Sequence, residues 1–360
     1  VNGTTGEPLD NEHSALLRAF TQDLNVTLNM TTTLDAEGNF TFDLTDVPQD
    51  WFFRVGVTYE DVEFGSDFGQ LTFDVTELEM PVTVYESTSD PSGINIEQLH
   101  LIIAFGPETM RVSELYQVNN NADTVFIGES GNADLGTFEM SVPDGATRVD
   151  FQRGFGSIDS FIPAQEVIPT ESGYADTLPL RPGPATLTLL ATYELPYDEQ
   201  GSITHPVNYD TSRVNLVLPD VGVELTETTD WVAGGQTAMQ GGSMSTYGQS
   251  DLPAGSELSL DLEGKPRSST ETTTGPIADN STELLIGAAA AVIVIGIGAV
   301  FVRRWRVEAD DEWDQDELLQ ALADLDDEFA AGEVDERTYK REREQLKAEL
   351  AAIWQSEEGA

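Results

Sequence analysis

Apolar and polar side chains alternate along most of the first 264 residues, and this period of two predicts β-strands rather than helices. Turn residues such as Gly38, Gly145 and Gly183 separate successive runs. The alternating runs are 26–30, 40–44, 53–59, 71–75 and 82–84, followed by 99–105, 138–142, 187–195, 214–218 and 258–262. We therefore predict a mainly β protein with two β-sandwich domains, residues 1–90 and 94–264. The Gly-rich stretch 234–245 predicts a flexible loop before the last strand.

The pattern changes at residues 284–302, which form an uninterrupted apolar run. At 1.5 Å per residue such a helix spans a hydrocarbon core of roughly 30 Å. A buried helix of a soluble domain is the alternative, but Arg303, Arg304 and Arg306 follow at once. Because positive residues stay on the cytoplasmic side, we predict a single-pass cell-membrane protein with its N-terminal region extracellular and its C-terminal tail cytoplasmic. Export requires a signal peptide, so we expect that one was cleaved or that the sequence is a fragment.

Two further segments flank the predicted membrane helix. Residues 265–283 are rich in Ser and Thr and predict a stalk. Residues 303–360 return to a helical period and predict a cytoplasmic helical hairpin. A hairpin of this size buries too little apolar surface to be stable alone, so we expect it to dock on a cytoplasmic partner or on a second copy. Gly287 and Ala291 give the membrane helix a small-residue face suited to self-association, or simply a lipid-facing one.

The charge balance excludes some functions and suggests an environment. The chain has 65 Asp and Glu against 17 Lys and Arg, a formal net charge of −48. Such a chain does not offer a nucleic-acid-binding surface. In molar salt the Debye length falls to about 3 Å, so the carboxylates are screened from one another. The composition is thus typical of a halophilic protein, with an ordinary acidic surface protein as the alternative.

Five Asn-x-Thr sequons support an extracellular location for the N-terminal region. The possible N-glycosylation sites are Asn2, Asn25, Asn29, Asn39 and Asn280. In a Thr-rich chain some of these arise by chance, and we expect one or two to carry glycan.

The sequence carries no catalytic constellation. It has no cysteine, its three histidines lie far apart, and it contains neither a phosphate-binding loop nor an HExxH helix. Asp35, Glu37 and Asn39 surround Gly38, but this spacing fails the template of a calcium loop and favours a plain hairpin turn. We therefore predict no catalytic, cofactor-binding or metal-binding residue, and no cofactor.

Two polar residues interrupt predicted strands. Glu114 falls on the apolar face of the strand that carries Val112 and Tyr116. The pattern favours a twist or bulge that lets Glu114 reach solvent, with a buried carboxylate as the alternative. His100 lies between Leu99 and Leu101 and is interpreted as an ordinary strand residue rather than a ligand.

Four strings resemble known modules. TTGEPLDN, TTTLDAEGNFTFDL and FFRVGVTYEDVEF together resemble the carboxypeptidase regulatory-like domain. This resemblance implies a transthyretin-like sandwich of about seven strands, sometimes associated with carbohydrate or surface attachment, and transfers no catalytic residue. The tail string LLQALADLDDEFAAGEVDERTYKREREQLKAEL resembles SHOCT-type helical hairpins and also cytoplasmic segments of cytochrome c biogenesis components. The whole chain looks like a haloarchaeal membrane-anchored surface protein.

These observations favour a non-enzymatic cell-surface protein that binds or scaffolds through its extracellular sandwiches. The expected partners are the membrane and an extracellular protein or polysaccharide. Trp51, Trp231 and Tyr247 are the candidates for stacking on sugar rings. The alternative function is an accessory subunit of an envelope assembly, such as cytochrome c biogenesis or export.

Overall fold

The computed structural model describes residues 1–267, except 22–24, 46, 49–50, 73–74, 76, 156, 227–229 and 240–241. In this part the chain has 21 strands and only two 3-10 turns, Pro91–Gly93 and Ala133–Leu135, so the prediction of a mainly β protein is confirmed. No helix here is long and apolar enough to cross a membrane. The predicted membrane helix 284–302, the cytoplasmic hairpin 303–360, most of the stalk and Asn280 lie outside the described residues.

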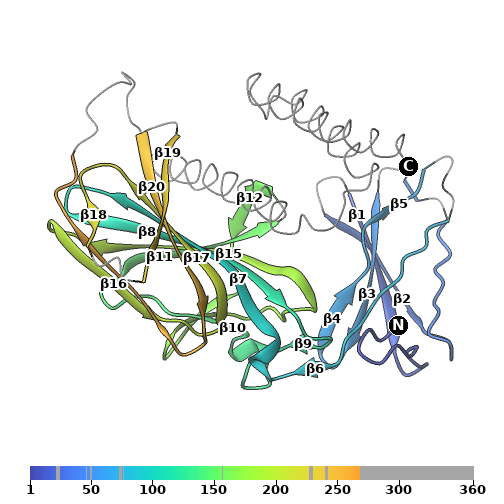
Figure 1. The fold of residues 1–360 in the computed structure, drawn as a ribbon. Helices are drawn as coiled ribbons and strands as arrows, with labels where there is room; N and C mark the ends of the chain where they lie inside the picture. Colours follow the sequence, from blue (N-terminus) through green and yellow to red (C-terminus); the bar gives the residue numbers. More distant parts are fainter. Residues whose placement is uncertain are drawn as a thin grey trace, which may run out of the picture. The chain divides into compact units, whose positions relative to one another are not determined.

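The N-terminal part is built on one antiparallel sheet with strand order β2-β1-β3-β4, and β5 pairs with β3 (Figure 1). On β1, the alternate residues Ala15, Leu17 and Ala19 are buried, as are Phe53 and Val55 on β3. These side chains belong to a core cluster formed almost wholly by residues 9–84. The strand bounds are β1 Ser14–Phe20, β2 Val26–Thr33, β3 Phe52–Tyr59, β4 Val62–Gly65 and β5 Gly69–Gln70.

The strands of this part differ from the predicted ones in two respects. The central strand β1 was not predicted, because two of its three buried positions are alanines that give the alternation little contrast. The predicted strand at 40–44 is wrong, and of the predicted strand 82–84 only Val84 forms an isolated parallel bridge, with Asn2. Phe40, Phe42 and Leu44 still pack against the core, so their alternation reflects burial without a ladder of backbone hydrogen bonds.

The second part is built on an eight-stranded sheet with order β12-β11-β15-β8-β7-β17-β20-β19. Neighbouring strands are antiparallel except β7 and β17, which are parallel. The face that carries Leu101, Val112, Leu189 and Leu216 is buried. The strand bounds are β7 Ile94–Phe105, β8 Thr109–Asn120, β11 Thr147–Phe155, β12 Ser157–Pro163, β15 Gly183–Pro196, β17 Asp210–Pro219, β19 Val232–Met239 and β20 Gly242–Leu252.

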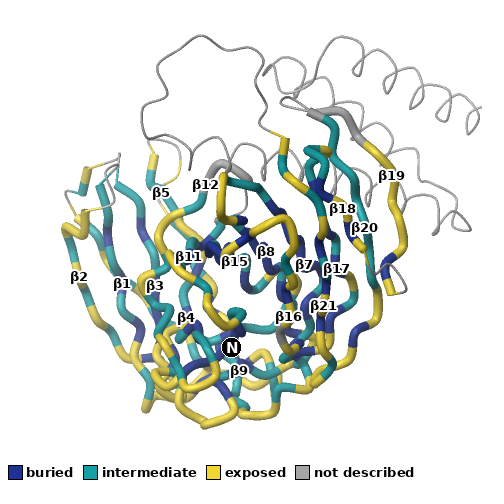
Figure 2. Tube along the Cα trace, turned by 90° about the vertical axis from the view of Figure 1, so that its left-hand side faces the viewer, coloured by how far each residue is buried: buried dark blue, intermediate teal, exposed yellow. Residues whose placement is uncertain are grey.

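Two three-stranded sheets, β10-β14-β13 and β16-β21-β18, supply the other side of this core. Phe138 from β10 and Ile203 from β16 are buried in the same cluster as Leu101, which makes the arrangement sandwich-like (Figure 2). The bounds are β10 Phe138–Met140, β13 Val167–Thr170, β14 Gly173–Asp176, β16 Gln200–Pro206, β18 Glu224–Leu225 and β21 Glu257–Glu263.

The predicted loop at 234–245 is wrong. The described residues of this stretch, 234–239 and 242–245, belong to β19 and β20, which pair from Val232–Gly248 to Met239–Gly242 with a register shift at Gly235. The segment lacks an apolar alternation because β19 lies at the edge of the sheet, where its side chains gain little from burial.

A short connection joins the two β parts. The strand β6, Ser87–Thr88, pairs in parallel with β9, Val125–Phe126. The hydroxyl of Thr4 donates a hydrogen bond of 2.6 Å to the carbonyl of Asp123. Val125 is buried in the N-terminal core cluster although it lies beyond residue 94. The two hydrophobic cores are therefore distinct but linked through this segment.

Candidate functional site

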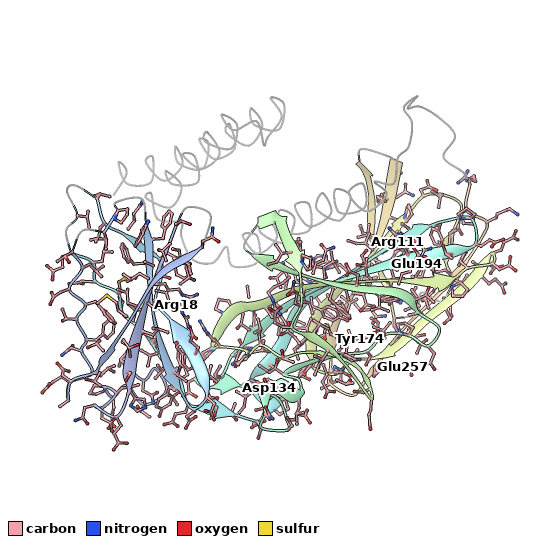
Figure 3. All side chains as sticks on the ribbon, turned by 180° about the vertical axis from the view of Figure 1, so that it is seen from behind. Arg18, Arg111, Asp134, Tyr174, Glu194 and Glu257 are labelled. Atoms are coloured by element: carbon pink, nitrogen blue, oxygen red, sulfur yellow. The ribbon has the colours of Figure 1, made fainter. Side chains whose placement is uncertain are left out.

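Two arginines lie on the outer face of the N-terminal sheet, the face opposite its core, and a third, Arg181, contacts its edge strand β4. Arg18 on β1 lies directly across from Arg54 on β3, and Figure 3 labels Arg18 on this sheet. Like charges at directly opposite positions destabilise a sheet. In a chain of net charge −48, two facing arginines therefore need a local explanation.

Glu63 on the neighbouring strand β4 offsets part of this charge. Arg18 donates to both carboxylate oxygens of Glu63, with the longer hydrogen bond at 3.2 Å. This bidentate contact with Arg18 is the main reason that the pKa of Glu63 lies below its usual range, and Arg54 and Arg181 add to the effect. Three guanidinium groups thus act on a single carboxylate.

Arg54 is held by aromatic and backbone contacts rather than by a carboxylate. Its guanidinium lies 5.6 Å from the centre of the Phe68 ring, and its Nε donates to the carbonyl of Ser66 at 3.2 Å. A side chain at Gly65 would clash with the guanidinium of Arg54, so this glycine provides the space that Arg54 occupies. No ion pair to Arg54 occurs among the residues that the structure describes.

Arg181 reaches the same place from the second β part. It donates to the carbonyl of Glu63 at 2.7 Å, and its guanidinium lies 5.4 Å from the centre of the Phe64 ring. Burial lowers its pKa, and repulsion from Arg54 lowers it further. Within the described ranges Arg181 also has no ion pair with a carboxylate side chain.

Aromatic rings complete this face. Phe20 and Phe52 are directly opposite each other on β1 and β3, and Phe68 packs edge-on against Phe20 at 5.7 Å. Phe68 is 54% exposed. We call the set Arg18, Arg54, Arg181, Phe20, Phe52 and Phe68 the arginine–phenylalanine face. Flat apolar rings beside guanidinium groups that lack an ion pair can bind a ligand that is both apolar and anionic.

Sequence reasoning missed this face because its residues are far apart in the chain. The one available signal was the scarcity of basic residues. The chain has only 17 Lys and Arg, so an arginine at a polar position of an alternating run indicates a positive charge on the outward face of that strand. Arg18 and Arg54 both lie at such outward positions.

The residues predicted to stack on sugars lie elsewhere. Trp231 is only 6% exposed, and its Nε1 donates to the carbonyl of Ser259, so it cannot form an exposed platform. Trp51 and Tyr247 are half-buried and pack against the two hydrophobic cores. The structure does not bring these three residues together.

The predicted glycosylation sites differ in exposure. Asn25, Asn29 and Asn39 are exposed. Asn2 is 5% exposed, and its Oδ1 accepts hydrogen bonds from the backbone N–H groups of Thr4 and Thr5. Asn2 is therefore the least suited of the four described sequons to carry a glycan in the folded protein.

In the turn around Gly38, the carboxylate of Asp35 accepts hydrogen bonds from the backbone of the turn itself. Oδ1 of Asp35 accepts hydrogen bonds from the backbone N–H groups of Glu37 and Asn39, at 3.0 and 2.7 Å. These bonds lower the pKa of Asp35. The part of the chain that the structure describes contains no group of three or more His, Asp or Glu side chains placed to hold a metal ion.

The prediction that Glu114 reaches solvent is wrong. Glu114 is fully buried, and β8 keeps its register on both sides, with Leu101 and Ala191 opposite Glu114. Its carboxylate accepts hydrogen bonds from the hydroxyls of Tyr116 at 2.5 Å and Tyr193 at 2.6 Å. These two donors, and the small side chain of Ala191, make a buried position possible without a bulge.

His100 is buried on the other face of the same sheet. It is 1% exposed, and its Nε2 has no hydrogen-bond partner among the described residues. Burial, and then repulsion from Arg213, lowers the pKa of His100 to about 4. His100 is therefore a neutral imidazole in the middle of β7 whose Nε2 has no hydrogen-bond partner among the described residues.

This shift makes stability depend on pH in a defined direction. Below its ordinary pKa of about 6.5 the unfolded chain binds a proton at His100 that the folded protein refuses until about pH 4. The contribution of His100 to the free energy of unfolding is therefore complete above about pH 6.5, and it is lost as the pH falls toward 4. The free energy of unfolding should fall between pH 7.5 and 4.5, and we expect this fall to be about 2 kcal/mol smaller in His100→Leu than in the unmodified protein. Urea unfolding in molar KCl measures it. An unchanged pH slope in the variant would contradict this assignment.

Comparisons with known proteins add little. No family model and no curated protein matches the chain. Among solved structures, the yeast delta-COP-I mu-homology domain complexed with a Dsl1 WxWxV peptide is similar at 11% identity. The match covers 50% of this chain and 77% of that chain, with a TM-score of 0.14. A likeness at this TM-score supports no conclusion about fold or function.

Proposed function

We propose that the protein is a non-enzymatic, single-pass cell-surface protein that binds an anionic polymer through the arginine–phenylalanine face. The observation that supports this most directly is the pair Arg54 and Arg181, which have no ion pair in the described part of a chain with 65 acidic residues. In the described part of a protein so rich in carboxylates, Arg54 and Arg181 share the field of Glu63 with Arg18 but form no ion pair of their own, so they can offer charge to another molecule.

The ligand chemistry follows from the side chains on this face. Guanidinium groups bind carboxylates through paired hydrogen bonds, and such contacts persist at molar salt because they act below the Debye length of about 3 Å. The rings of Phe20, Phe52 and Phe68 offer apolar surface to the faces of sugar rings. We therefore favour a polysaccharide that carries carboxylates as the ligand.

Substitution of Arg54 tests this function. We expect Arg54→Gln to weaken binding of full-length protein to polygalacturonate about tenfold or more at molar KCl, because one charged hydrogen-bond donor pair contributes about 1.5–3 kcal/mol. Phe68→Ala should weaken it as well. Arg267→Gln is the matched control, since it removes an equally rare charge from an exposed position beside Asp220.

The ligand panel separates the possible outcomes. Neutral dextran should not bind, whereas binding to polyglutamate with equal affinity would indicate an acidic protein partner instead. If Arg54→Gln and Arg267→Gln bind polygalacturonate as the unmodified protein does, the face is not the binding site.

A further inference from the structure

The strand β2 leaves one edge of the N-terminal sheet open. β2 is the last strand in the sheet order and pairs only with β1. No backbone hydrogen bond within the described residues joins β2 to any other segment. Its residues, VTLNMTTT, are mostly exposed along its length (Figure 2). Every second backbone group of β2 is therefore available to a strand from another molecule.

Proteins usually blunt such edges with charges, prolines or bulges, and β2 has few of these devices. It contains no charged residue and no proline, and its pairing with β1 is regular from Thr33 to Leu28, with an irregularity only at its first residues. The other edges of the two large sheets differ. β4 carries Glu63, β12 carries Asp159 and Pro163, and β19 has a register shift at Gly235.

Two of the sequons coincide with this unprotected edge. Asn25 directly precedes β2, and Asn29 lies in its middle, opposite Arg18. Both asparagines are exposed, as are Thr27 and Thr31, which complete the sequons. The edge that lacks charge thus carries two positions suited to a bulky hydrophilic group.

We propose that N-linked glycans on Asn25 and Asn29 cover the edge of β2 and prevent two copies from pairing through it. A paired strand would lie about 4.8 Å away, with its side chains about 5 Å from those of β2, so a sugar on Asn29 would crowd the side chains of that strand. In the transfer, Nδ2 of asparagine bonds to the anomeric carbon of a phosphate-activated glycan, the phosphate carrier leaves, and the amide loses one proton. The inference rests on the extracellular placement proposed above.

Isosteric substitutions of threonine test the inference in the full-length protein, purified from its native membrane at molar salt. Thr31→Val and Thr27→Val remove the sequons while keeping β-branched residues in the strand. Thr33→Val is the matched control, because Thr33 is exposed on the same strand face as Thr31 but belongs to no sequon. Intact and peptide mass spectrometry report the glycans, and sedimentation in detergent reports association relative to the unmodified protein.

We expect the double variant to lose glycan mass at Asn25 and Asn29 and to form species of twice the mass of the unmodified form. Thr33→Val should keep both the glycans and the original mass. A lysine added to the double variant by Thr33→Lys should restore the association state of the unmodified protein, since charge is the other common protection of an edge.

Three outcomes would overturn the inference. Unmodified Asn25 and Asn29 in a protein whose N-terminal region is cleaved by protease added to intact cells would refute the glycans and leave the proposed placement intact. Protection from that protease would refute the placement as well. Glycan loss without any change in association would refute the shielding of β2.

Discussion

Glu114→Ala is expected to lower the free energy of unfolding by about 4 kcal/mol. Two buried hydroxyls, those of Tyr116 and Tyr193, lose their acceptor, at a cost of about 1–3 kcal/mol each, and the truncated side chain leaves a cavity. Burial, and then the Glu114 carboxylate, raises the pKa of both tyrosines, so both remain donors across the accessible pH range. Urea unfolding at constant molar KCl, followed by near-ultraviolet circular dichroism, measures the loss.

A conservative variant separates hydrogen bonding from packing at this position. Glu114→Gln keeps the volume and can still bond both hydroxyls, as acceptor for one and donor to the other, so it should lose less than half as much. Tyr116→Phe and Tyr193→Phe should each lose about 1–2 kcal/mol. Equal losses for Glu114→Ala and Glu114→Gln would show that the two hydroxyls do not depend on an acceptor at this position.

Arg153→Met is expected to lower the free energy of unfolding by about 3–5 kcal/mol at pH 7. Arg153 on β11 pairs with Asp176 on β14, and the Asp176 side chain is fully buried. Removal of one partner leaves a buried carboxylate without its counter-charge. The Asp176 Oδ1 would keep only its hydrogen bond of 2.7 Å from the backbone N–H of Leu178. Urea unfolding in molar KCl measures the loss here too.

The pH dependence identifies the cause of this loss. Burial raises the pKa of Asp176, and Arg153 opposes the shift. A carboxyl group whose folded pKa is raised stabilises the fold below its unfolded pKa, and this contribution is lost as pH rises through the folded pKa. Arg153→Met should therefore recover stability toward acidic pH. The double variant Arg153→Met/Asp176→Asn should lie within about 1–2 kcal/mol of the unmodified protein; a loss as large as that of Arg153→Met alone would contradict the ion-pair explanation.

The sequence predicted the strands whose alternation is strong. β7, β15, β17 and β21 place apolar residues, most of them large, at every second position of the expected runs, and each was expected. β1 and β19 were not, because alanine and glycine occupy the positions where apolar contrast would have shown them. The run 40–44 has the right period but forms no strand. An alternation of apolar residues shows which side chains are buried. Strand pairing also requires a neighbouring strand for backbone hydrogen bonds, and the local sequence does not reveal that neighbour.

The candidate site was harder to predict than the strands, because its residues are far apart in the sequence. Arg54 and Arg181 are 127 positions apart, and only the folded chain brings their guanidinium groups to the same carboxylate. Glu114 was misplaced for a related reason, since its two donors lie on β8 and β15 and only Tyr116 is near it in sequence. The sequons were visible from the start, but their position on an open edge was not.

The parallel pair β7 and β17 bears on how the protein folds. Leu99 pairs with Val214, so the centre of the large sheet joins segments separated by more than a hundred residues. Closing so long a loop costs conformational entropy before the stabilising contacts form, so the step is slow. Sheets with such non-local pairing fold in milliseconds to seconds rather than microseconds. The edge of β7 that pairs with β17 therefore stays unpaired until β17 has been synthesised. A chain delivered across a membrane from its N-terminus would complete the pair of β7 and β17 only after residue 217 has emerged, and until then one edge of β7 is open to aggregation.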